Sequence, residues 1–236
     1  MTEHTKHKTE THHEHSNTIT LKSIDEEKPV DNRKSLITVF VIVGIIIVII
    51  AAVVLISKFM PNTNTVKYNN YTFEKFEGNK WMTQQLIRNR VYNIPFYYNP
   101  TQVIDIPADP NSVLTLRQFG FNPNGIVYIT VDPNESSKVV LAGVEYARIL
   151  GTSYNIYNMN VKAALSKPYA ENISVNSPVI TCNNQSKDAL IIYQVVSNKN
   201  LISVRGNCIY LESINANESV RVADAFAFRL LSIIRE

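Results

Sequence analysis

The distribution of apolar and polar residues divides the chain into three segments. Residues 1–35 are polar and show no apolar periodicity, whereas residues 36–56 contain no charged side chain and consist mostly of Ile and Val. Residues 58–236 alternate short apolar runs with polar turns. At a rise of about 1.5 Å per residue, a helix over the apolar run is roughly 30 Å long, which matches the hydrocarbon core of a bilayer. The run is too long for a cleaved signal peptide, so the pattern predicts one retained membrane-spanning helix over residues 36–57.

The first half of the third segment predicts strands. Aromatic and polar residues alternate over residues 71–76, and a second strand is expected over residues 81–87. Residues 90–98 predict a third strand, and Pro95 places it at a sheet edge because proline lacks a backbone N–H donor. Residues 112–119 are expected to form a short helix or strand among several prolines.

The second half predicts a β-α-β unit, then a hairpin and a closing helix. Short apolar runs over residues 126–131 and 189–196 are typical of buried strands, and residues 157–165 alternate as a further strand. Residues 201–211 are expected to return as the hairpin partner of residues 189–196.

Two amphipathic helices complete the prediction. The helix over residues 135–150 is expected to bury one apolar face, formed by Val140, Gly143, Val144, Ala147 and Leu150. The C-terminal helix has its apolar positions at i, i+3, i+4 and i+7, namely Ala223, Phe226, Ala227, Leu230, Leu231 and Ile234. Asn215 and Glu218 resemble a capping box at its start.

These elements predict an α+β fold, with one N-terminal transmembrane helix followed by a mixed-sheet domain. That domain is expected to have a helix after a central strand and a C-terminal helix. The expected organisation is a disordered, His-rich cytoplasmic tail (1–35), the transmembrane helix (36–57), a tether (58–70) and an extracytoplasmic domain (71–236). The lipid bilayer is therefore an expected partner of residues 36–57.

Charge favours a cytoplasmic N-terminus in a single-pass protein of the cell membrane. Lys28, Arg33 and Lys34 lie just before the apolar run, and fewer basic residues follow it closely. The third segment carries five Asn-x-Ser/Thr sequons, candidates for N-glycosylation, at Asn70, Asn134, Asn172, Asn184 and Asn217. A net charge of only +3 argues against a dedicated nucleic-acid binder.

Cys182 and Cys208 are the two cysteines of the chain. An even cysteine count suits an oxidising compartment. Alternation over residues 201–211 places Cys208 on the same inward face as Ile202 and Val204. We expect a disulfide, which would stabilise the fold by about 3–4 kcal/mol on the chain-entropy model. The alternative is a pair of free, buried thiols.

All five histidines lie in the N-terminal tail, at His4, His7, His12, His13 and His15. This spacing can bind a transition metal. If the initiator Met is removed, the free amine and the histidine at the third position can surround Cu(II) or Ni(II) with nitrogen ligands. The favoured interpretation is a low-complexity polar tail whose histidines are incidental.

The third segment contains no histidine, which excludes Ser-His-Asp and Cys-His nucleophile activation and histidine zinc sites there. It also has no Cys-x-x-Cys and no glycine-rich phosphate loop, and no cofactor is expected. The acids Asp105, Asp109, Asp132 and Glu135 could form an acid pair or a calcium site. Turn and helix-cap chemistry is favoured for Asp132, which follows a buried strand. We expect these acids not to converge in one pocket.

The strand region is dense in aromatic residues, at Tyr68, Tyr71, Phe73, Phe76, Trp81, Tyr92, Phe96, Tyr97 and Tyr98. Such side chains bind sugars and partner proteins, but in strands they more often pack in the core. Core packing is favoured, with Tyr97 and Tyr98 as surface candidates.

Asp224, beside the apolar stripe of the last helix, is expected to pair with Arg221 or a neighbouring strand.

Three short motifs resemble an uncharacterised family of small archaeal single-pass membrane proteins. They are Tyr128-Ile129-Thr130-Val131-Asp132-Pro133 before a helix, Pro178-Val179-Ile180-Thr181-Cys182, and Gly206-Asn207-Cys208-Ile209 before a final helix with Ala223-Asp224. The family is similar in having one N-terminal span and a two-cysteine extracytoplasmic domain. The resemblance covers residues 71–234 and implies location and topology rather than an activity.

Three functional hypotheses follow. The favoured one is a non-enzymatic, membrane-anchored binding or structural module of the cell envelope, which contacts another envelope protein or a surface glycan. A pilin-like subunit fits the basic Arg33-Lys34 pair and the long apolar helix, but no glycine precedes a cleavage point. A carboxylate-dependent enzyme such as a glycosidase needs two acids about 5–10 Å apart across a cleft.

Overall fold

The structure is a computed structural model that describes residues 32–59, 64–169 and 177–235. The chain divides into two compact units, Met1–Pro61 and Asn62–Glu236. We call the second unit the C-terminal domain and describe each unit by itself.

Helix α1 (Asn32–Phe59) contains the uncharged apolar run. Its segment Leu36–Ser57 is long and apolar enough to cross a membrane, with a mean hydropathy of 3.7. None of this segment is buried within the structure, and its Ile, Val and Leu side chains are exposed along the whole length. A helix that exposes apolar side chains all round is suited to lipid.

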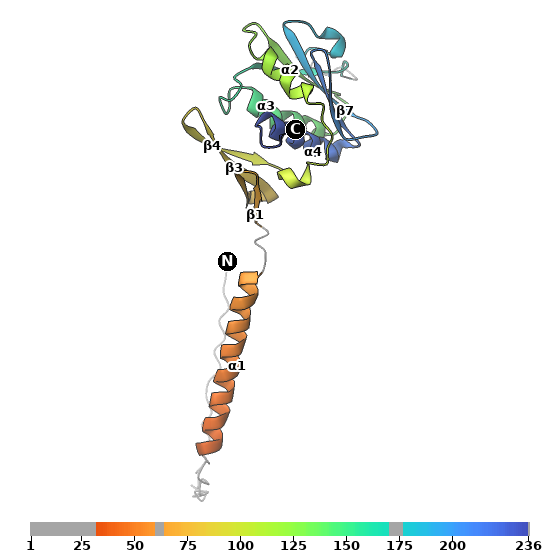
Figure 1. The fold of residues 1–236 in the computed structure, drawn as a ribbon. Helices are drawn as coiled ribbons and strands as arrows, with labels where there is room; N and C mark the ends of the chain where they lie inside the picture. The colour runs from red at the N-terminus through yellow and green to blue at the C-terminus, as the bar shows by residue number, and fades with distance from the viewer. Residues whose placement is uncertain (1–31, 60–63, 170–176, 236) are drawn as a thin grey trace, which may run out of the picture. The chain divides into compact units, whose positions relative to one another are not determined.

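The C-terminal domain has the α+β fold that the sequence predicts, with two sheets and helices between them (Figure 1). The first sheet is an antiparallel meander of β1 (Thr65–Tyr68), β2 (Tyr71–Phe76), β3 (Lys80–Ile87) and β4 (Arg90–Phe96). The second sheet contains β5 (Ile126–Val131), β6 (Asn160–Leu165), β7 (Ala189–Val196), β8 (Leu201–Arg205) and β9 (Cys208–Ser213). Its strand order is β6-β5-β7-β9-β8, with every pair parallel except β8–β9. The longer helices are α2 (Asn111–Phe119), α3 (Ser137–Leu150) and α4 (Ala216–Leu230), and the short 3-10 helices are η1 (Glu77–Asn79), η2 (Pro100–Gln102) and η3 (Cys182–Asn184).

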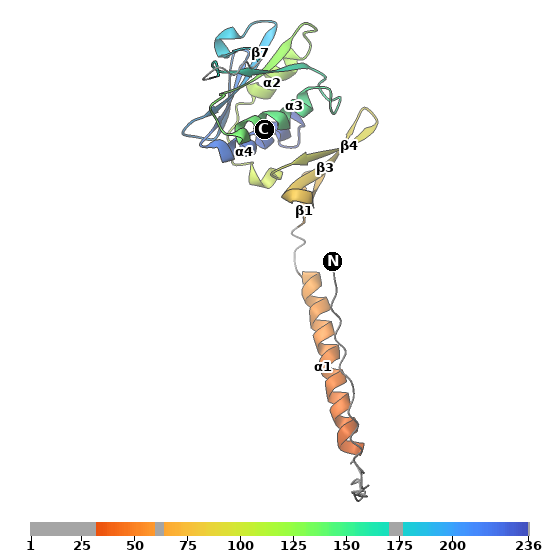
Figure 2. The same ribbon diagram turned by 180° about the vertical axis from the view of Figure 1, so that it is seen from behind.

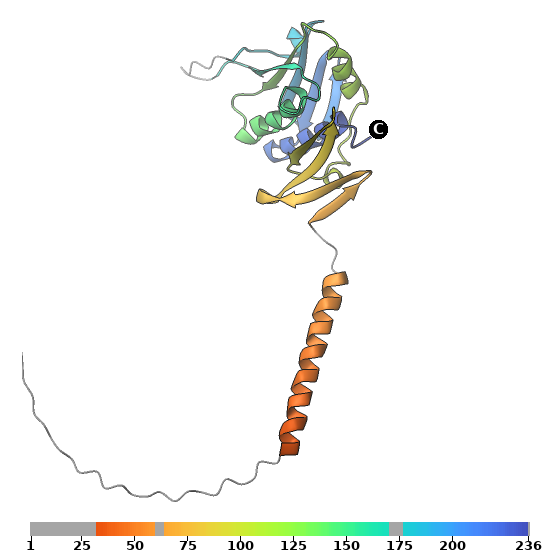
Figure 3. The same cartoon turned by 90° about the vertical axis from the view of Figure 1, so that its left-hand side faces the viewer.

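Helix α4 is the centre of the core because it packs between the two sheets (Figures 2 and 3). The ring of Phe228 lies 5.6 Å from that of Phe73 in β2 and 4.4 Å from that of Phe96 in β4. Phe226 contacts Tyr146 of α3 edge to face at 5.7 Å. Burial on several sides explains why nearly all of α4 after its first turn is inaccessible to solvent.

The predicted start of α4 is confirmed in part. The side chain of Asn215 accepts hydrogen bonds from the backbone N–H groups of Asn217 and Glu218, at 2.9 and 3.0 Å. The carboxylate of Glu218 binds Asn200 and Arg221 instead of closing a capping box. The first turn is therefore capped by one side chain and joined to the neighbouring loop by the other.

The expected hairpin of residues 189–196 with 201–211 is wrong. Residues 201–211 turn back at Gly206-Asn207, so that they form β8 and most of β9, and β9 inserts between β7 and β8. Val204 pairs with Ile209, which places Cys208 on the opposite face of the sheet from Ile202 and Val204. A left-handed glycine at position 206, with φ of 61°, permits this tight turn.

The expected buried face of the helix over residues 135–150 is wrong in part, because Gly143 and Leu150 are buried as expected but Val140 and Val144 are not. Helix α3 buries Val139, Ala142, Tyr146 and Ile149, whereas Val140 and Val144 are 50% and 48% exposed. Residues 139–144 are apolar except for the glycine at 143, so the sequence supports two overlapping stripes. Packing against both β5 and α4 selects the stripe that contains Tyr146.

Several boundaries differ from those expected. Strand β1 lies within the segment 58–70 predicted as a tether, and α1 continues to Phe59. Helix α3 begins at Ser137 behind the cap Ser136, and β6 begins at Asn160. The strand with Pro95 does lie at the edge of the meander, as predicted.

Candidate functional site

An apolar groove lies between α3 and the helix-covered face of β5 and β6. We call it the α3–β6 groove; its volume is about 410 Å³. The α3 side is formed by Val140, Gly143, Val144 and Ala147, and the sheet side by Ile129, Val131, Val161 and Ala163. The groove exists because α3 packs toward α4 and leaves the edge strand β6 partly uncovered.

Half of the sheet side of the α3–β6 groove, Val161 and Ala163, belongs to the edge strand β6. β6 pairs with β5 on one side only. On its other side, the described residues supply one bridge, at Leu165, whose N–H and C=O bond to Pro178 O and Ile180 N, both at 2.9 Å. An edge strand offers its free backbone N–H and C=O groups to a further strand.

The sequence-based interpretation missed this groove because it assigned Val140 and Val144 to the core. The signal that could have revealed it is the width of the apolar surface on residues 139–150. A helix that covers one sheet face needs a single stripe, whereas this one has apolar positions on two sides. The second stripe leaves an apolar surface for another contact.

A buried glutamate and a partly buried arginine form a pair on α3 beside this groove. Glu145 is buried and forms an ion pair with Arg148, which also lines the groove. The guanidinium of Arg148 further donates to the carbonyl of Pro95 in β4, at 3.3 Å. Burial raises the pKa of Glu145, although the nearby positive charge of Arg148 opposes this. The pair joins α3 to the meander.

Asp224 is a fully buried carboxylate on α4. Its Oδ2 accepts the backbone N–H of Tyr97 at 2.9 Å and that of Tyr98 at 2.8 Å, directly after β4. Its Oδ1 has no hydrogen-bond partner among the described residues. Burial raises the pKa of Asp224 well above its usual range. Of the two predicted partners, Arg221 is wrong, and the observed partners directly follow a strand rather than belonging to it.

Three of the four candidate acids, Asp105, Asp109 and Asp132, each have a separate partner. Asp105 binds Arg221, and this hydrogen bond lowers the pKa of Asp105. Partial burial works to raise the pKa of Asp132, but its contacts with Lys167 and the backbone N–H of Asn134 outweigh this and lower it.

Asp132 therefore stands in a turn after β5, as predicted. Asp109 accepts the backbone N–H of Asn111 at 2.9 Å, at the start of α2. None of the described pockets is lined by any of Asp105, Asp109, Asp132 or Glu135. Within the described residues, no group of three or more His, Cys, Asp and Glu side chains could hold a metal.

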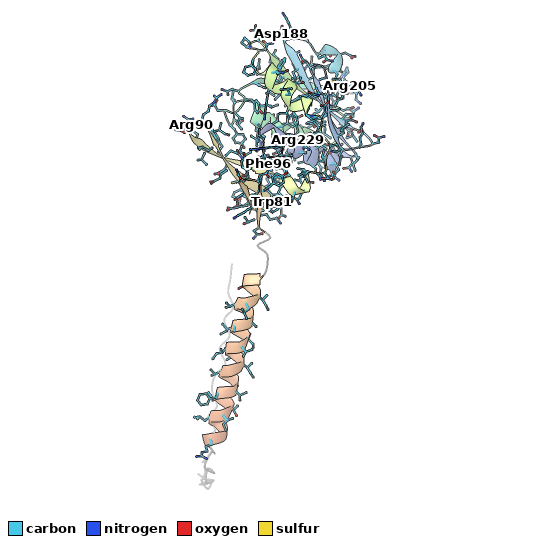
Figure 4. All side chains as sticks on the ribbon, viewed as in Figure 1. Trp81, Arg90, Phe96, Asp188, Arg205 and Arg229 are labelled. Carbon is cyan, nitrogen blue, oxygen red and sulfur yellow. A yellow bond between two sulfur atoms is a disulfide. The ribbon has the colours of Figure 1, made fainter. Side chains whose placement is uncertain are left out.

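The aromatic set divides between core and surface. Phe73, Trp81 and Phe96 are buried, and Figure 4 shows Trp81 and Phe96 on the meander. The remaining members are partly or largely exposed, namely Tyr68, Tyr71, Phe76, Tyr92, Tyr97 and Tyr98. Tyr97 carries the ammonium of Lys80 over its ring at 4.4 Å, a cation–π contact.

Cys182 and Cys208 form a disulfide that joins η3 to β9.

Of the sequons, Asn70 and Asn134 are exposed in turns, while the side chains of Asn184 and Asn217 bond to Thr181 and Lys138. Asn172 lies outside the described residues, as do the histidines of the proposed metal cluster, His4, His7, His12, His13 and His15.

Comparison with known proteins finds no matching family model, no matching curated protein and no matching solved structure.

Proposed function

We propose that this chain is a membrane-anchored binding module of the cell envelope. In this proposal the α1 helix holds the protein in the membrane, and the C-terminal domain lies outside and holds an extended apolar segment of another envelope protein. The observation that carries the proposal is the α3–β6 groove, an open apolar surface beside an edge strand.

The chemistry of the groove favours an apolar, extended partner. Val161 and Ala163 are two residues apart on β6 and project to the same face, so a strand added at this edge would place alternate side chains into the groove. Arg148 is the one charged residue in its lining, and its guanidinium is bound to Glu145. Backbone pairing would supply affinity, and the apolar lining would select small or branched aliphatic side chains.

The separate partners of Asp105, Asp109 and Asp132 support a contact function. Two of them, Asp105 and Asp132, have lowered pKa values, whereas a general acid in a glycosidase needs a raised one. The Glu145 carboxyl does have a raised pKa, but it is buried against Arg148.

Site-specific photo-crosslinking in native membranes tests the proposal. A photoreactive residue replaces Val144 in the full chain, and the matched control carries it at Leu114 of α2, which is equally exposed, at 51% against 48%. The expected result is an adduct at position 144 whose peptide maps to an apolar segment of one envelope protein. The adduct should be lost when Val140→Lys puts a charge into the groove.

Equal crosslinking at positions 144 and 114 would contradict the proposal, because it would indicate random contact. So would an adduct at position 144 that Val140→Lys leaves unchanged. Mass spectrometry of the mature N-terminus distinguishes the proposed binding module from the pilin-like alternative, because a pilin-like subunit requires a cleaved and processed chain.

A further inference from the structure

The β3–β4 hairpin presents an apolar pair at its tip. Leu86 of β3 and Val91 of β4 are directly opposite one another in the register and are 71% and 63% exposed. The two turn residues, Arg88 and Asn89, both have positive φ, 47° and 65°, as a tight two-residue hairpin turn requires. Exposed aliphatic side chains that share one face of a hairpin tip form a small apolar wedge.

The other face of this tip is fixed to the body of the domain. The ring of Tyr92 contacts that of Tyr154 edge to face at 6.0 Å. The guanidinium of Arg88 donates to the side-chain oxygen of Asn155 at 3.3 Å. Residues of the loop after α3 therefore hold the hairpin, so that Leu86 and Val91 are presented on an ordered element rather than on a free loop.

The charge around the tip has one sign. Residues 86–91, which form the tip, contain Arg88 and Arg90 and no Asp or Glu. Arg90 is exposed and stands at the tip of the hairpin (Figure 4). Aliphatic side chains at a tip that also carries an exposed arginine suit the interface of an anionic bilayer, where the apolar groups enter the headgroup boundary and the cation binds phosphate.

The covalent connection limits how far the hairpin can lie from the membrane. Helix α1 ends at Phe59 and β1 begins at Thr65, so that the connecting chain spans at most about 20 Å. Thr65 is in register with Glu74, and Glu74 with Met82. Leu86 is four residues further along β3, about 14 Å at the rise of a strand. A membrane that contains α1 is therefore within reach of the tip.

We propose that the β3–β4 hairpin tip docks onto the surface of the membrane that α1 spans, with Leu86 and Val91 in the headgroup region and Arg90 on anionic lipid phosphates. The contact would restrict the orientation of the C-terminal domain. The proposal does not depend on the α3–β6 groove, because the two surfaces belong to different sheets. It also does not depend on which side of the membrane holds the domain.

Fluorescence of the full chain in lipid nanodiscs tests this proposal. Both native cysteines are in the disulfide, so Leu86→Cys provides a single thiol for an environment-sensitive fluorophore. In phosphatidylglycerol nanodiscs the expected result is a blue-shifted emission that brominated acyl chains quench. Phe121→Cys, at an exposed apolar residue outside the hairpin, is the matched control and should show neither effect. Arg90→Glu combined with Leu86→Cys should reduce both effects.

Equal quenching at positions 86 and 121, or none at position 86, would overturn the proposal. A blue shift at position 86 without bromine quenching would also overturn it, since it would indicate contact with protein, such as a second copy of the chain. Equal quenching in phosphatidylcholine and phosphatidylglycerol would overturn the assignment to anionic lipid.

Discussion

At the scale of single residues, Asp224 connects the two halves of the C-terminal domain. Its carboxylate on α4 receives two backbone N–H groups from the chain that leaves β4. The charged or titratable groups that act on it are Glu145 and Arg148 of α3, and the two N–H groups partly offset the cost of its burial. A carboxylate in this position orients the meander, but its ionisation is unfavourable because burial removes it from water.

We predict that Asp224 makes the protein less stable as the pH rises. The pKa of an unfolded aspartate is about 3.9, and burial raises it in the folded state, so the folded protein binds the proton more tightly. Its stabilising contribution is fully present below about pH 4 and is lost as the pH rises through the folded-state pKa. Asp224→Asn keeps an oxygen for both N–H donors and does not ionise. Thermal unfolding of the full chain in nanodiscs should therefore show a flatter pH dependence for Asp224→Asn than for wild type.

Asp224→Ala is the contrasting variant. It removes both hydrogen bonds and leaves a small cavity, with an expected loss of about 2–4 kcal/mol of unfolding free energy. Parallel pH curves for wild type and Asp224→Asn would show that the carboxyl does not titrate differently in the folded state. Equal stability of the Ala and Asn variants would show that the two N–H bonds contribute little.

At the scale of elements, the disulfide fixes the long connection between β6 and β7. Cys182 lies in η3 of this connection. Cys208 is the first residue of β9, and its side chain is fully buried. Asn207, next to Cys208, donates its backbone N–H to the side chain of Gln185 at 2.6 Å. The bond therefore joins the segment around η3 to the start of an inner strand of the sheet, beside a turn that is already hydrogen-bonded to that segment.

We predict that replacing both cysteines, Cys182→Ala with Cys208→Ala, lowers the unfolding free energy by about 3 kcal/mol, because the bond constrains the unfolded chain. Chemical denaturation measures this, and wild type under reducing conditions is the matched control. The double variant and the reduced wild type should agree. Unchanged stability of the wild type on reduction would contradict the prediction.

At the scale of the whole molecule, an apolar helix and a disulfide-containing domain belong to one chain. The helix fits a membrane and the disulfide fits an oxidising compartment. Both features, and the basic residues before the apolar run, favour a C-terminal domain on the outer side of the membrane.

We predict that a membrane-impermeant maleimide labels Phe121→Cys on intact cells. Phe121 is 88% exposed, and no native thiol of the chain is free to react. Thr5→Cys in the N-terminal tail is the control and should be labelled only after lysis. The opposite pattern would place the tail outside and would overturn the proposed orientation.

Local patterns were sufficient for part of this structure. The apolar helix, the strand that ends just before Asp132 and the cap Asn215 each depend on a few neighbouring residues, so the sequence alone identified them. The same holds for the edge position of the strand with Pro95, because a missing N–H donor is a property of that residue.

Contacts between distant segments decided the rest. The choice between the two apolar stripes of α3 depends on α4, and the insertion of β9 between β7 and β8 depends on which strand edges meet. The partner of Asp224 lies more than a hundred residues earlier in the chain. Periodicity along a chain fixes which side chains share a face, but it does not fix what that face packs against. For that reason the tertiary structure alone revealed the α3–β6 groove and the position of Leu86 and Val91 on one hairpin face.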